Sequence, residues 1–348
     1  MKNVYFKKVT DFDNTQLITQ STYQMLKELI QNEKVILPKV MPLKVHFGEK
    51  GNTTFIKPPN FEGVKKFLRE HKIKTCYIET NVLYRGSRTY TKNHIQTARE
   101  HGFVDLDIVI ADGDLDSPYN EVEINKKHFS KCKIGKRFEE FDGFMVLAHF
   151  KGHGLAGFGG AIKQLGMGFA SRGGKLAQHS DNVPFVAKDK CISCGVCVRK
   201  CPTNAIKLND CAKIDSKLCV GCASCSTACP RNAIKNDWSG SNFVEKLAEY
   251  AYAASLGKNN IYVTFAGNIT EQCDCCGEHM KNIADNIGIF VSTDPVAIDM
   301  AVMDMLGENE ATKSFGIGRQ ILNYAQSIGL GTTKYNLCIC ANEMIIEE

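Results

Sequence analysis

The sequence predicts an α/β fold, a mostly parallel or mixed sheet flanked by helices, with a small cysteine-rich module inserted into it. Three observations predict this arrangement. Short apolar runs alternate with segments of helical periodicity before residue 187, and the same alternation resumes after residue 237. Nine of the 16 cysteines lie between these two parts, in residues 191–229. The cysteine-rich tract also repeats itself internally.

Residues 1–186 carry the first part of the predicted sheet. Apolar runs predict strands at 41–47, 74–79, 106–111 and 141–150. Helical spacing of the apolar residues predicts helices at 61–71 and 91–101. Short alternating pieces between 119 and 137 predict a hairpin or an excursion at the edge of the sheet. A glycine-rich loop and a helix then lead into the cysteine tract.

Residues 238–348 resume the same pattern. We expect a helix at 242–256, strands at 260–266 and 288–291, a final helix, and a terminal strand at 336–341. Asp294 followed by Pro295 is a strong helix start, because aspartate caps the first turn and proline suits its first position. That helix should reach Leu306. We therefore expect one α/β domain with residues 187–237 inserted, and two separate α/β domains are the alternative.

The cysteine tract contains the run C-x2-C-x2-C-x3-C-P twice, at 191–202 and 219–230, with an offset of 28 residues. This is the spacing of bacterial ferredoxins with two clusters, in which the fourth cysteine of each run ligates the other cluster. The spacing therefore predicts two [4Fe–4S] clusters. The first would be held by Cys191, Cys194, Cys197 and Cys229, and the second by Cys219, Cys222, Cys225 and Cys201. Two zinc sites are the alternative, since CxxC pairs also bind zinc, but zinc rarely needs so many close cysteines and the proline.

Composition narrows the classes of function. A chain of 348 residues with 43% hydrophobic and 23% charged residues is typical of a globular protein with about two domains. A net charge of +5 without a basic run argues against nucleic-acid binding. We expect no membrane association, because no apolar run approaches about 18 residues. The first residues lack the apolar core of a signal peptide, so the many cysteines indicate metal and redox use in the cytoplasm.

Polar residues follow the carboxyl ends of the predicted strands, where open α/β sheets bind ligands. We expect a polar cleft there, with the cysteine-rich module close to it. The residues concerned are His46, Glu49, Thr80, Asn81, Asp112, Asp114, His149, Lys151, His153, Asn268, Thr293 and Asp294.

The segment 149–168 is the candidate wall of this cleft. Gly157, Gly159 and Gly160 would let the backbone approach a ligand, and the helix after them would offer free N–H groups to an anion. It matches neither the Walker A pattern nor GxGxxG. A tight turn against a closely packed helix is the alternative.

Two pairs of side chains near this wall are the candidate catalytic residues. They are Lys151 with His153, and Lys175 with His179. Lone histidines more often serve packing or surface hydrogen bonds, but these two flank the same glycine-rich wall with lysines nearby.

Two further groups are candidates for binding. Arg85 and Arg88 could grip a carboxylate or phosphate, although a solvated charged loop is an equal alternative. Cys273 and Cys275 could face the same way and hold a third metal or cluster. The alternatives for the cysteines at 273–276 are buried thiols or an oxidisable pair.

Together these segments resemble the domain-of-unknown-function 362 family, in its members that carry a 4Fe–4S ferredoxin module. The resemblance spans nearly the whole chain. It is carried by VHFGEKGN at 45–52, ETNVLYRGSR at 79–88, IADGD at 110–114, residues 149–168, SRGGKLAQHS at 171–180, both cysteine runs, CDC at 273–275 and STDPVAID at 292–299. It implies the architecture and the iron–sulfur content but no reaction. Gln164 stands where the family pattern has asparagine.

These observations favour a low-potential reductase. Two clusters would relay electrons from a redox partner protein to a small anionic substrate or a bound metal in the cleft. An electron-carrier subunit that docks a partner enzyme, and a scaffold that loads a metallocentre into a client protein, are the alternatives.

Overall fold

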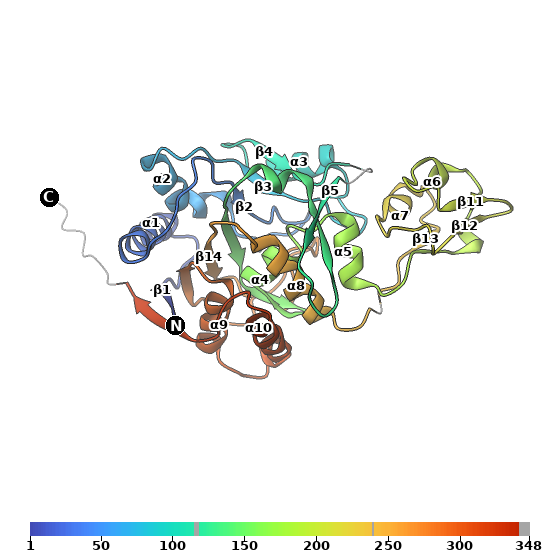
Figure 1. Cartoon of the computed structure of the whole chain (residues 1–348). Coiled ribbons are helices and arrows are strands. Elements are labelled where there is room, and N and C mark those ends of the chain that lie inside the picture. The colour runs from blue at the N-terminus through green and yellow to red at the C-terminus, as the bar shows by residue number, and fades with distance from the viewer. Residues whose placement is uncertain (115–117, 239, 341–348) are drawn as a thin grey trace.

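An eight-stranded sheet forms the centre of the computed structural model, which describes residues 1–114, 118–238 and 240–340 (Figure 1). In the part of the chain so described, only the third strand runs antiparallel to its neighbours. The strand order is β16 (Tyr335–Ile339), β1 (Lys2–Lys8), β15 (Gly288–Ser292), β14 (Ile261–Ala266), β7 (Met145–His149), β2 (Leu43–Lys44), β3 (Tyr77–Glu79) and β4 (Ile108–Ile110).

The strand order reverses between β2 and β7, and this reversal positions the site. The chain adds β3 and β4 on one side of β2, then returns to place β7 and β14 on the other side. Strands β2 and β7 are parallel neighbours, with Leu43 opposite Met145 and Lys44 opposite Val146. Such a reversal opens a crevice at the carboxyl ends of the two strands, because the connections leave them in opposite directions.

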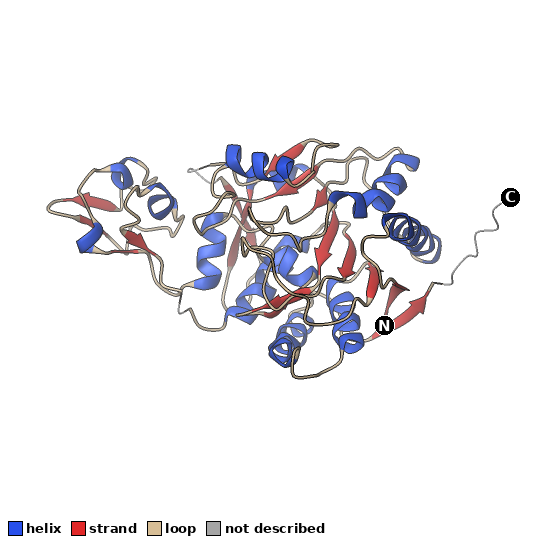
Figure 2. Cartoon of the chain, turned by 180° about the vertical axis from the view of Figure 1, so that it is seen from behind, coloured by secondary structure: helices blue, strands red, loops and turns tan. Residues whose placement is uncertain are grey.

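Helices cover both faces of the sheet (Figure 2). One face packs against α1 (Thr15–Asn32), α2 (Glu62–Glu70) and α3 (Thr91–Glu100); the other packs against α4 (Ala161–Gly166), α8 (Phe243–Ser255), α9 (Pro295–Leu306) and α10 (Gly318–Ser327). Strand residues alternate between the two cores, so that Met145 and Leu147 face one and Val146 faces the other. A parallel sheet buried on both faces needs continuous apolar strands, which explains the apolar runs in the sequence.

The predicted elements have close counterparts, with differences at their ends. The expected strand 41–47 is reduced to the two residues of β2, and β1 and α1 were not anticipated. The predicted hairpin is β5 (Tyr119–Glu123) with β6 (Lys131–Gly135). Asp294 caps α9 as predicted, accepting hydrogen bonds from the backbone N–H groups of Val296 and Ala297, both at 2.9 Å. Residue 341, the predicted end of the last strand, lies outside the described residues.

Shorter elements complete the α/β part. They are α5 (Arg172–His179), the small hairpin of β8 (Lys151–His153) and β9 (Gly157–Gly159), and 3-10 turns at Pro58–Phe61, Lys136–Glu140, Lys188–Lys190 and Lys313–Ile317. Across the described ranges, the helices are all too short or too polar to span a bilayer.

The cysteine tract folds as a small unit that projects from one end of the α/β part (Figure 1). It contains α6 (Val196–Arg199), α7 (Ser224–Ala228), the pair β11 (Ile206–Leu208) and β12 (Ala212–Ile214), and the pair β10 (Phe185–Val186) and β13 (Ile234–Lys235). The 28-residue repeat is also present in the backbone. Left-handed residues recur at that offset, as Ser193 and Gly221, Gly195 and Ala223, and Asn204 and Asn232.

Candidate functional site

A cavity of about 330 Å³ lies at the crevice between β2 and β7. Its wall includes His46, which follows β2, and His149 and Lys151, which end β7 and begin β8. Thr80 joins them from the end of β3. The volume lies at the lower end of the range for small-molecule sites, so a compact ligand fits it best.

The charges that line this cavity are mainly positive. Arg88, Lys151, Lys163 and Lys175 line it, against the single lining carboxylate of Glu79 in the described part of the chain. The buried ammonium of Lys44 already neutralises Glu79, with an Nζ–Oε1 distance of 2.9 Å. An anionic ligand would therefore be favoured over a cationic one.

A buried ionic network fixes one side of the cavity. Asp274 accepts hydrogen bonds from Nδ1 of His149 at 2.9 Å and lies 3.0 Å from Nζ of Lys151. The other ring nitrogen of His149 faces the carbonyl oxygen of Gly267 at 2.9 Å. Because both partners of the ring only accept, His149 must carry hydrogen on both nitrogens and is a cation. Burial alone would raise the pKa of Asp274, but the charges of His149 and Lys151 outweigh it and hold that pKa well below its usual range.

His153 and His179 meet at the same aromatic ring. The ring of Phe243 stacks on His179 at a centroid distance of 4.7 Å and on His153 at 6.2 Å. Burial, followed by the charge of Lys163, lowers the pKa of His153 to about 2 and that of His179 to about 4. Both rings are therefore neutral at pH 7 and can serve as hydrogen-bonding groups at the cavity wall.

Lys175 lines the cavity, but its ammonium donates all of its hydrogen bonds to other groups of the protein. Its ammonium donates to Oγ1 of Thr80, to the carbonyl of Asn81 at 2.8 Å and to the carbonyl of Ala170 at 2.9 Å. Burial lowers its pKa to about 8. It therefore ties α5 to the end of β3 and contributes charge to the cavity, with no N–H left for a ligand.

The glycine-rich wall departs from the prediction at the helix that follows it. The backbone N–H groups of Ala161 and Ile162 donate to the carboxylate of Asp299, at 2.7 and 2.9 Å. The expectation that this helix offers free N–H groups to an anion was therefore wrong. The buried carboxylate on α9 needs partners, and the start of α4 supplies them. Burial raises the pKa of Asp299 to about 7.

The three glycines have different surroundings. Gly159 and Gly160 line the cavity, whereas Gly157 packs beside residues 315–318 and does not. A Cβ on Gly160 would lie 2.4 Å from Oδ1 of Asp299, so this position requires glycine. A Cβ on Gly159 would crowd Lys163 at 3.2 Å.

The two arginines predicted to bind an anion, Arg85 and Arg88, lie in different places. Arg88 is fully buried at the cavity wall, where Nη1 lies 3.1 Å from Nε2 of His46 and Nε lies 3.3 Å from the carboxylate of Glu49. Arg85 turns away and donates to the carbonyl oxygen of Cys229 in the cysteine-rich unit. Of the two arginines, only Arg88 faces the cavity.

Cys273 and Cys275 both line the cavity. The Nζ atom of Lys163 lies 3.2 Å from Sγ of Cys273. Contact with Cys275, and then burial, raise the pKa of the Cys273 thiol, while Lys163 opposes both effects. Across residues 1–114, 118–238 and 240–340, no three or more His, Cys, Asp and Glu side chains are grouped so as to hold one metal ion.

Eight of the nine cysteines of the 191–229 tract surround two separate hollows. One is lined by Cys191, Cys194, Cys197 and Cys229, and the other by Cys201, Cys219, Cys222 and Cys225. Each group combines three cysteines of one run with the last cysteine of the other. Backbone N–H groups point at two of the sulfur atoms, from Ala205 to Cys201 and from Ala233 to Cys229, both at 3.2 Å. These two contacts are related by the same 28-residue offset.

The second half of the tract lies against the α/β part. Ala223, between Cys222 and α7, packs with Leu83 and Leu176 in a small buried cluster. Leu83 also lines the cavity, so this cluster connects the cavity wall with the loop that carries Cys222. Tyr90 adds a hydrogen bond from its hydroxyl to the carbonyl of Thr227 at 3.1 Å.

Several other predicted polar residues lie elsewhere. Asp112 accepts from the backbone N–H of Asn81 at 2.8 Å, behind the cavity. Thr293 and Asp294 follow β15, and their predicted place in the cleft was wrong because that strand is antiparallel and ends at the opposite edge of the sheet.

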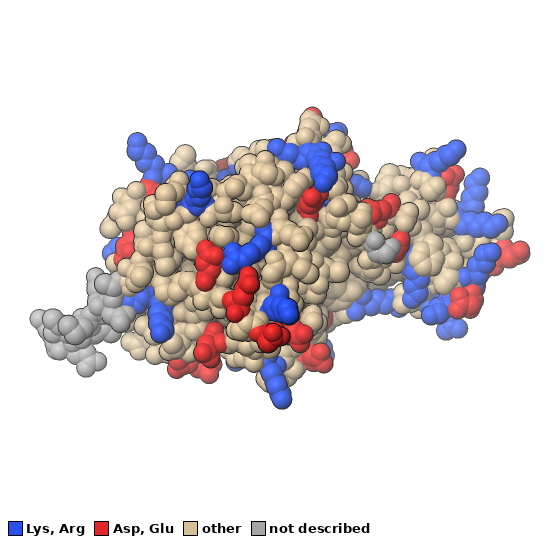
Figure 3. Space-filling view, turned by 90° about the horizontal axis from the view of Figure 1, so that it is seen from below, with Lys and Arg blue, Asp and Glu red and all other residues tan. Residues whose placement is uncertain are grey.

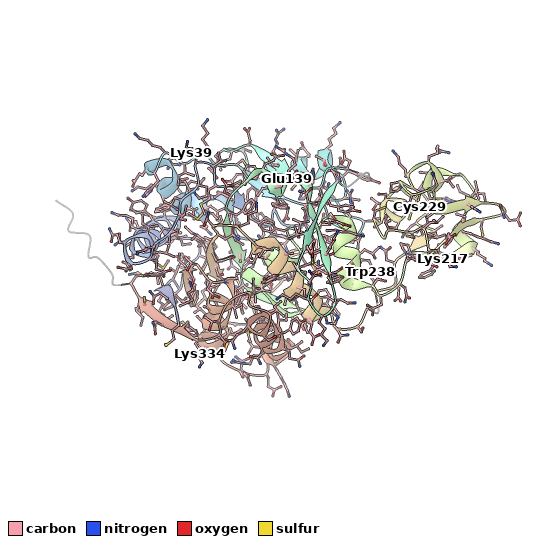
Figure 4. All side chains as sticks on the ribbon, in the orientation of Figure 1. Lys39, Glu139, Lys217, Cys229, Trp238 and Lys334 are labelled. Carbon is pink, nitrogen blue, oxygen red and sulfur yellow. The ribbon has the colours of Figure 1, made fainter. Side chains whose placement is uncertain are left out.

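The predicted catalytic and binding residues did not include Lys163, Tyr84 and Trp238, which line the cavity. Trp238 is the one tryptophan of the chain and lies where the cysteine-rich unit joins the α/β part (Figure 4). Its place directly after the cysteine tract was a usable signal.

Comparison with known proteins adds a family and no activity. No curated protein matches the sequence. A crystal structure of a Thermotoga maritima protein is similar over 88% of this chain and 59% of that one, with 11% sequence identity and a TM-score of 0.42. The chain therefore spans about three fifths of that protein's length. The model of the family described as "Domain of unknown function (DUF362)" matches residues 42–304, which is most of the chain. The protein belongs to this DUF362 family.

Proposed function

We propose that the protein is an iron–sulfur reductase, in which electrons from a partner protein pass through residues 187–237 to a small anionic substrate in the cavity beside β2 and β7. The observation that carries this proposal is the buried cluster of Leu83, Leu176 and Ala223. It joins the wall of a cationic cavity to a loop between two predicted cluster ligands.

The cysteine-rich unit fits two [4Fe–4S] clusters. Its two hollows have the crossed cysteine sets of a two-cluster ferredoxin, and N–H groups that point at sulfur favour thiolate ligands. When bound, such clusters supply one-electron transfer.

The side chains that line the cavity can bind an anion and donate protons to it. Lys163 is the ammonium with most N–H groups still available, since Cys273 is its hydrogen-bond partner within the described residues. Lys151 keeps one N–H beyond its contacts with Asp274 and the carbonyl of His149. The neutral rings of His153 and His179, which also line the cavity, can donate hydrogen bonds to a ligand. This arrangement favours an enzyme over a simple electron carrier, which would need no such cavity.

The electron donor is expected to be an acidic protein. Residues 187–237 contain nine Lys and Arg and four Asp, so this unit accounts for the whole formal net charge of +5. Figure 3 shows the Lys and Arg side chains gathered on the end of the molecule where this unit lies. Lys190 and Arg231 border the hollow of the first cysteine set, next to the exposed side chains of Ile192 and Leu208. A basic rim around apolar residues suits brief docking of an acidic carrier.

A single-turnover experiment tests the proposal. The anaerobically purified holoprotein is reduced by dithionite, separated from it, and mixed with a panel of small anionic acceptors while the visible absorbance of the reduced clusters is followed. We expect reoxidation by at least one acceptor, and a rate at least tenfold lower in the Lys163→Met variant. The reductase assignment would be wrong if reoxidation were equally fast in the wild type and in Lys163→Met with every acceptor.

A further inference from the structure

In the segment Cys273-Asp274-Cys275-Cys276, the carboxylate and the two thiols beside it have different partners. Asp274 points inward and is 1% exposed, held by His149 and Lys151. The thiols on either side of it, Cys273 and Cys275, line the cavity and contact each other. A backbone hydrogen bond from the N–H of Cys276 to the carbonyl of Cys273, at 2.9 Å, closes the turn. The ionic anchor of Asp274 therefore presents a pair of neighbouring thiols to the same cavity.

Lys163 gives the two thiols of this pair different surroundings. Its ammonium lies 3.2 Å from Sγ of Cys273, and it is held there from α4. Contact with Cys275 and burial hold the pKa of Cys273 above its usual value, and Lys163 opposes both effects, so that it favours the thiolate, the nucleophilic form of cysteine. The same cation would repel a metal ion bound to that sulfur. The geometry therefore favours thiol chemistry over the third metal site expected from the sequence.

We propose that Cys273 and Cys275 are a redox-active dithiol that reduces an anionic disulfide of small size. This inference rests on the proposed function, because the clusters would restore the dithiol after each turnover. The positive charge of the cavity selects an anionic substrate, and its volume of about 330 Å³ selects a small one.

The atoms and electrons balance in two stages. The thiol of Cys273 gives up its proton as its sulfur attacks one sulfur of the substrate disulfide, a mixed disulfide forms, and the first substrate thiol leaves with that proton. Cys275 then attacks Cys273, which releases the second substrate thiol and leaves a Cys273–Cys275 disulfide. Two electrons from the reduced partner protein, delivered one at a time through residues 187–237, and two protons from water convert that disulfide back to two thiols.

The two thiols of Cys273 and Cys275 would also connect one-electron transfer by the clusters with the two-electron reduction of a disulfide. Iron–sulfur clusters give single electrons, whereas breaking an S–S bond to two thiols takes two. A dithiol next to the relay can store two electrons before the substrate arrives. The cluster of Leu83, Leu176 and Ala223, together with the place of Leu83 in the cavity wall, would bring the relay next to this dithiol.

The test uses two small disulfides of opposite charge. Reduced holoprotein, freed of reductant, is mixed with 3,3′-dithiodipropionate or with cystamine, quenched with iodoacetamide and digested with trypsin. Peptide 259–281 contains Cys273, Cys275 and Cys276 and no other cysteine. We expect dithiodipropionate to convert it to a form with one internal disulfide between Cys273 and Cys275 and one alkylated Cys276, at least tenfold faster than cystamine does. In Cys275→Ser the mixed disulfide should accumulate on Cys273.

Three outcomes would overturn the inference. They are full alkylation of peptide 259–281 after both disulfides, a link confined to Cys275 and Cys276, and equal rates with the two charges. Lys163→Met should slow the reaction at pH 7 and recover at higher pH, which a merely structural lysine would not do. The same measurements test the proposed function separately. If dithionite reduces the iron but the dithiol of Cys273 and Cys275 never forms, only this inference is refuted. If the dithiol forms in a protein without iron, only the electron relay is refuted.

Discussion

The carboxylate of Asp274 accepts a hydrogen bond of 2.9 Å from the ring of His149, and both residues are almost fully buried. With Lys151 at 3.0 Å, two cations share this anion, and the anion lies between two cysteines that face the cavity. The ion cluster is therefore a structural support for the site. Substitution of Asp274 tests this role first.

Replacing Asp274 by alanine should destabilise the protein strongly. The substitution leaves two buried cations without their counter-charge, a loss of about 3–5 kcal/mol in comparable buried pairs. We expect the thermal midpoint of the holoprotein to fall by about 5 °C or more. Glu140→Ala is the control, because it removes an exposed ion pair with Arg137 at 2.9 Å and should change stability by at most about 1 kcal/mol. Equal midpoints for the two variants would show that the buried network contributes little.

Gly160→Ala should disturb the glycine-rich wall, and Gly154→Ala should not. A Cβ at Gly160 would lie 2.4 Å from the carboxylate of Asp299, whereas the nearest atom to a Cβ at Gly154 is 3.9 Å away. We expect Gly160→Ala to cost about 1–3 kcal/mol through overpacking. Thermal unfolding of both variants measures the difference. Equal effects of the two alanines would mean that the contact with Asp299 does not constrain this wall.

Anion binding in the cavity should weaken as the pH rises through about 8. The pKa of Lys175 is lowered to about 8 by burial, so its ammonium loses a proton near that pH and the cavity loses a positive charge. Because this pKa lies below the ordinary value of 10.5, the contribution of Lys175 to stability rises with pH between about 8 and 10.5. The affinity for sulfate, measured by calorimetry from pH 7 to pH 9, should fall several-fold in the wild type. The fall should be clearly smaller in Lys175→Met. If the affinity for sulfate fell equally with pH in both proteins, Lys175 would not be the group that causes the fall.

Charge reversal on the cysteine-rich unit should slow its reduction by an acidic electron carrier. The double variant Lys190→Glu, Arg231→Glu changes the basic rim next to the first cysteine set. We expect its bimolecular reduction rate by a plant-type ferredoxin, a small acidic carrier, to fall about tenfold at low ionic strength. Lys39→Glu is the control, since Lys39 lies at the opposite end of the molecule (Figure 4). A rate that does not depend on salt or on these charges would contradict docking at this rim.

Periodicity was sufficient to predict the fold class, because a sheet buried on both faces leaves long apolar runs in the sequence. It could not predict the strand order, since the reversal between β2 and β7 depends on which connections cross the sheet. The misplacement of Thr293 and Asp294 follows from this. They come after an apolar strand like the others, and only pairing shows that β15 is antiparallel.

The prediction of site residues was best where covalent spacing limits the options. Local spacing in the cysteine tract already groups the eight cysteines as the two hollows do. Partners distant in sequence were not predictable, and the N–H groups of Ala161 and Ile162 illustrate why. Their acceptor, Asp299, lies more than 130 residues away on another helix. Likewise, nothing local distinguishes Arg88, which faces the cavity, from Arg85, which binds Cys229.

The most direct test of the central claim is the metal content of the anaerobically purified protein. We predict about eight irons and eight sulfides per chain, with EPR signals of two reduced [4Fe–4S] clusters after dithionite treatment. Cys273→Ser should leave both counts unchanged if residues 273–276 bind no metal. A chain that carries zinc and no iron would contradict the electron relay on which the account depends.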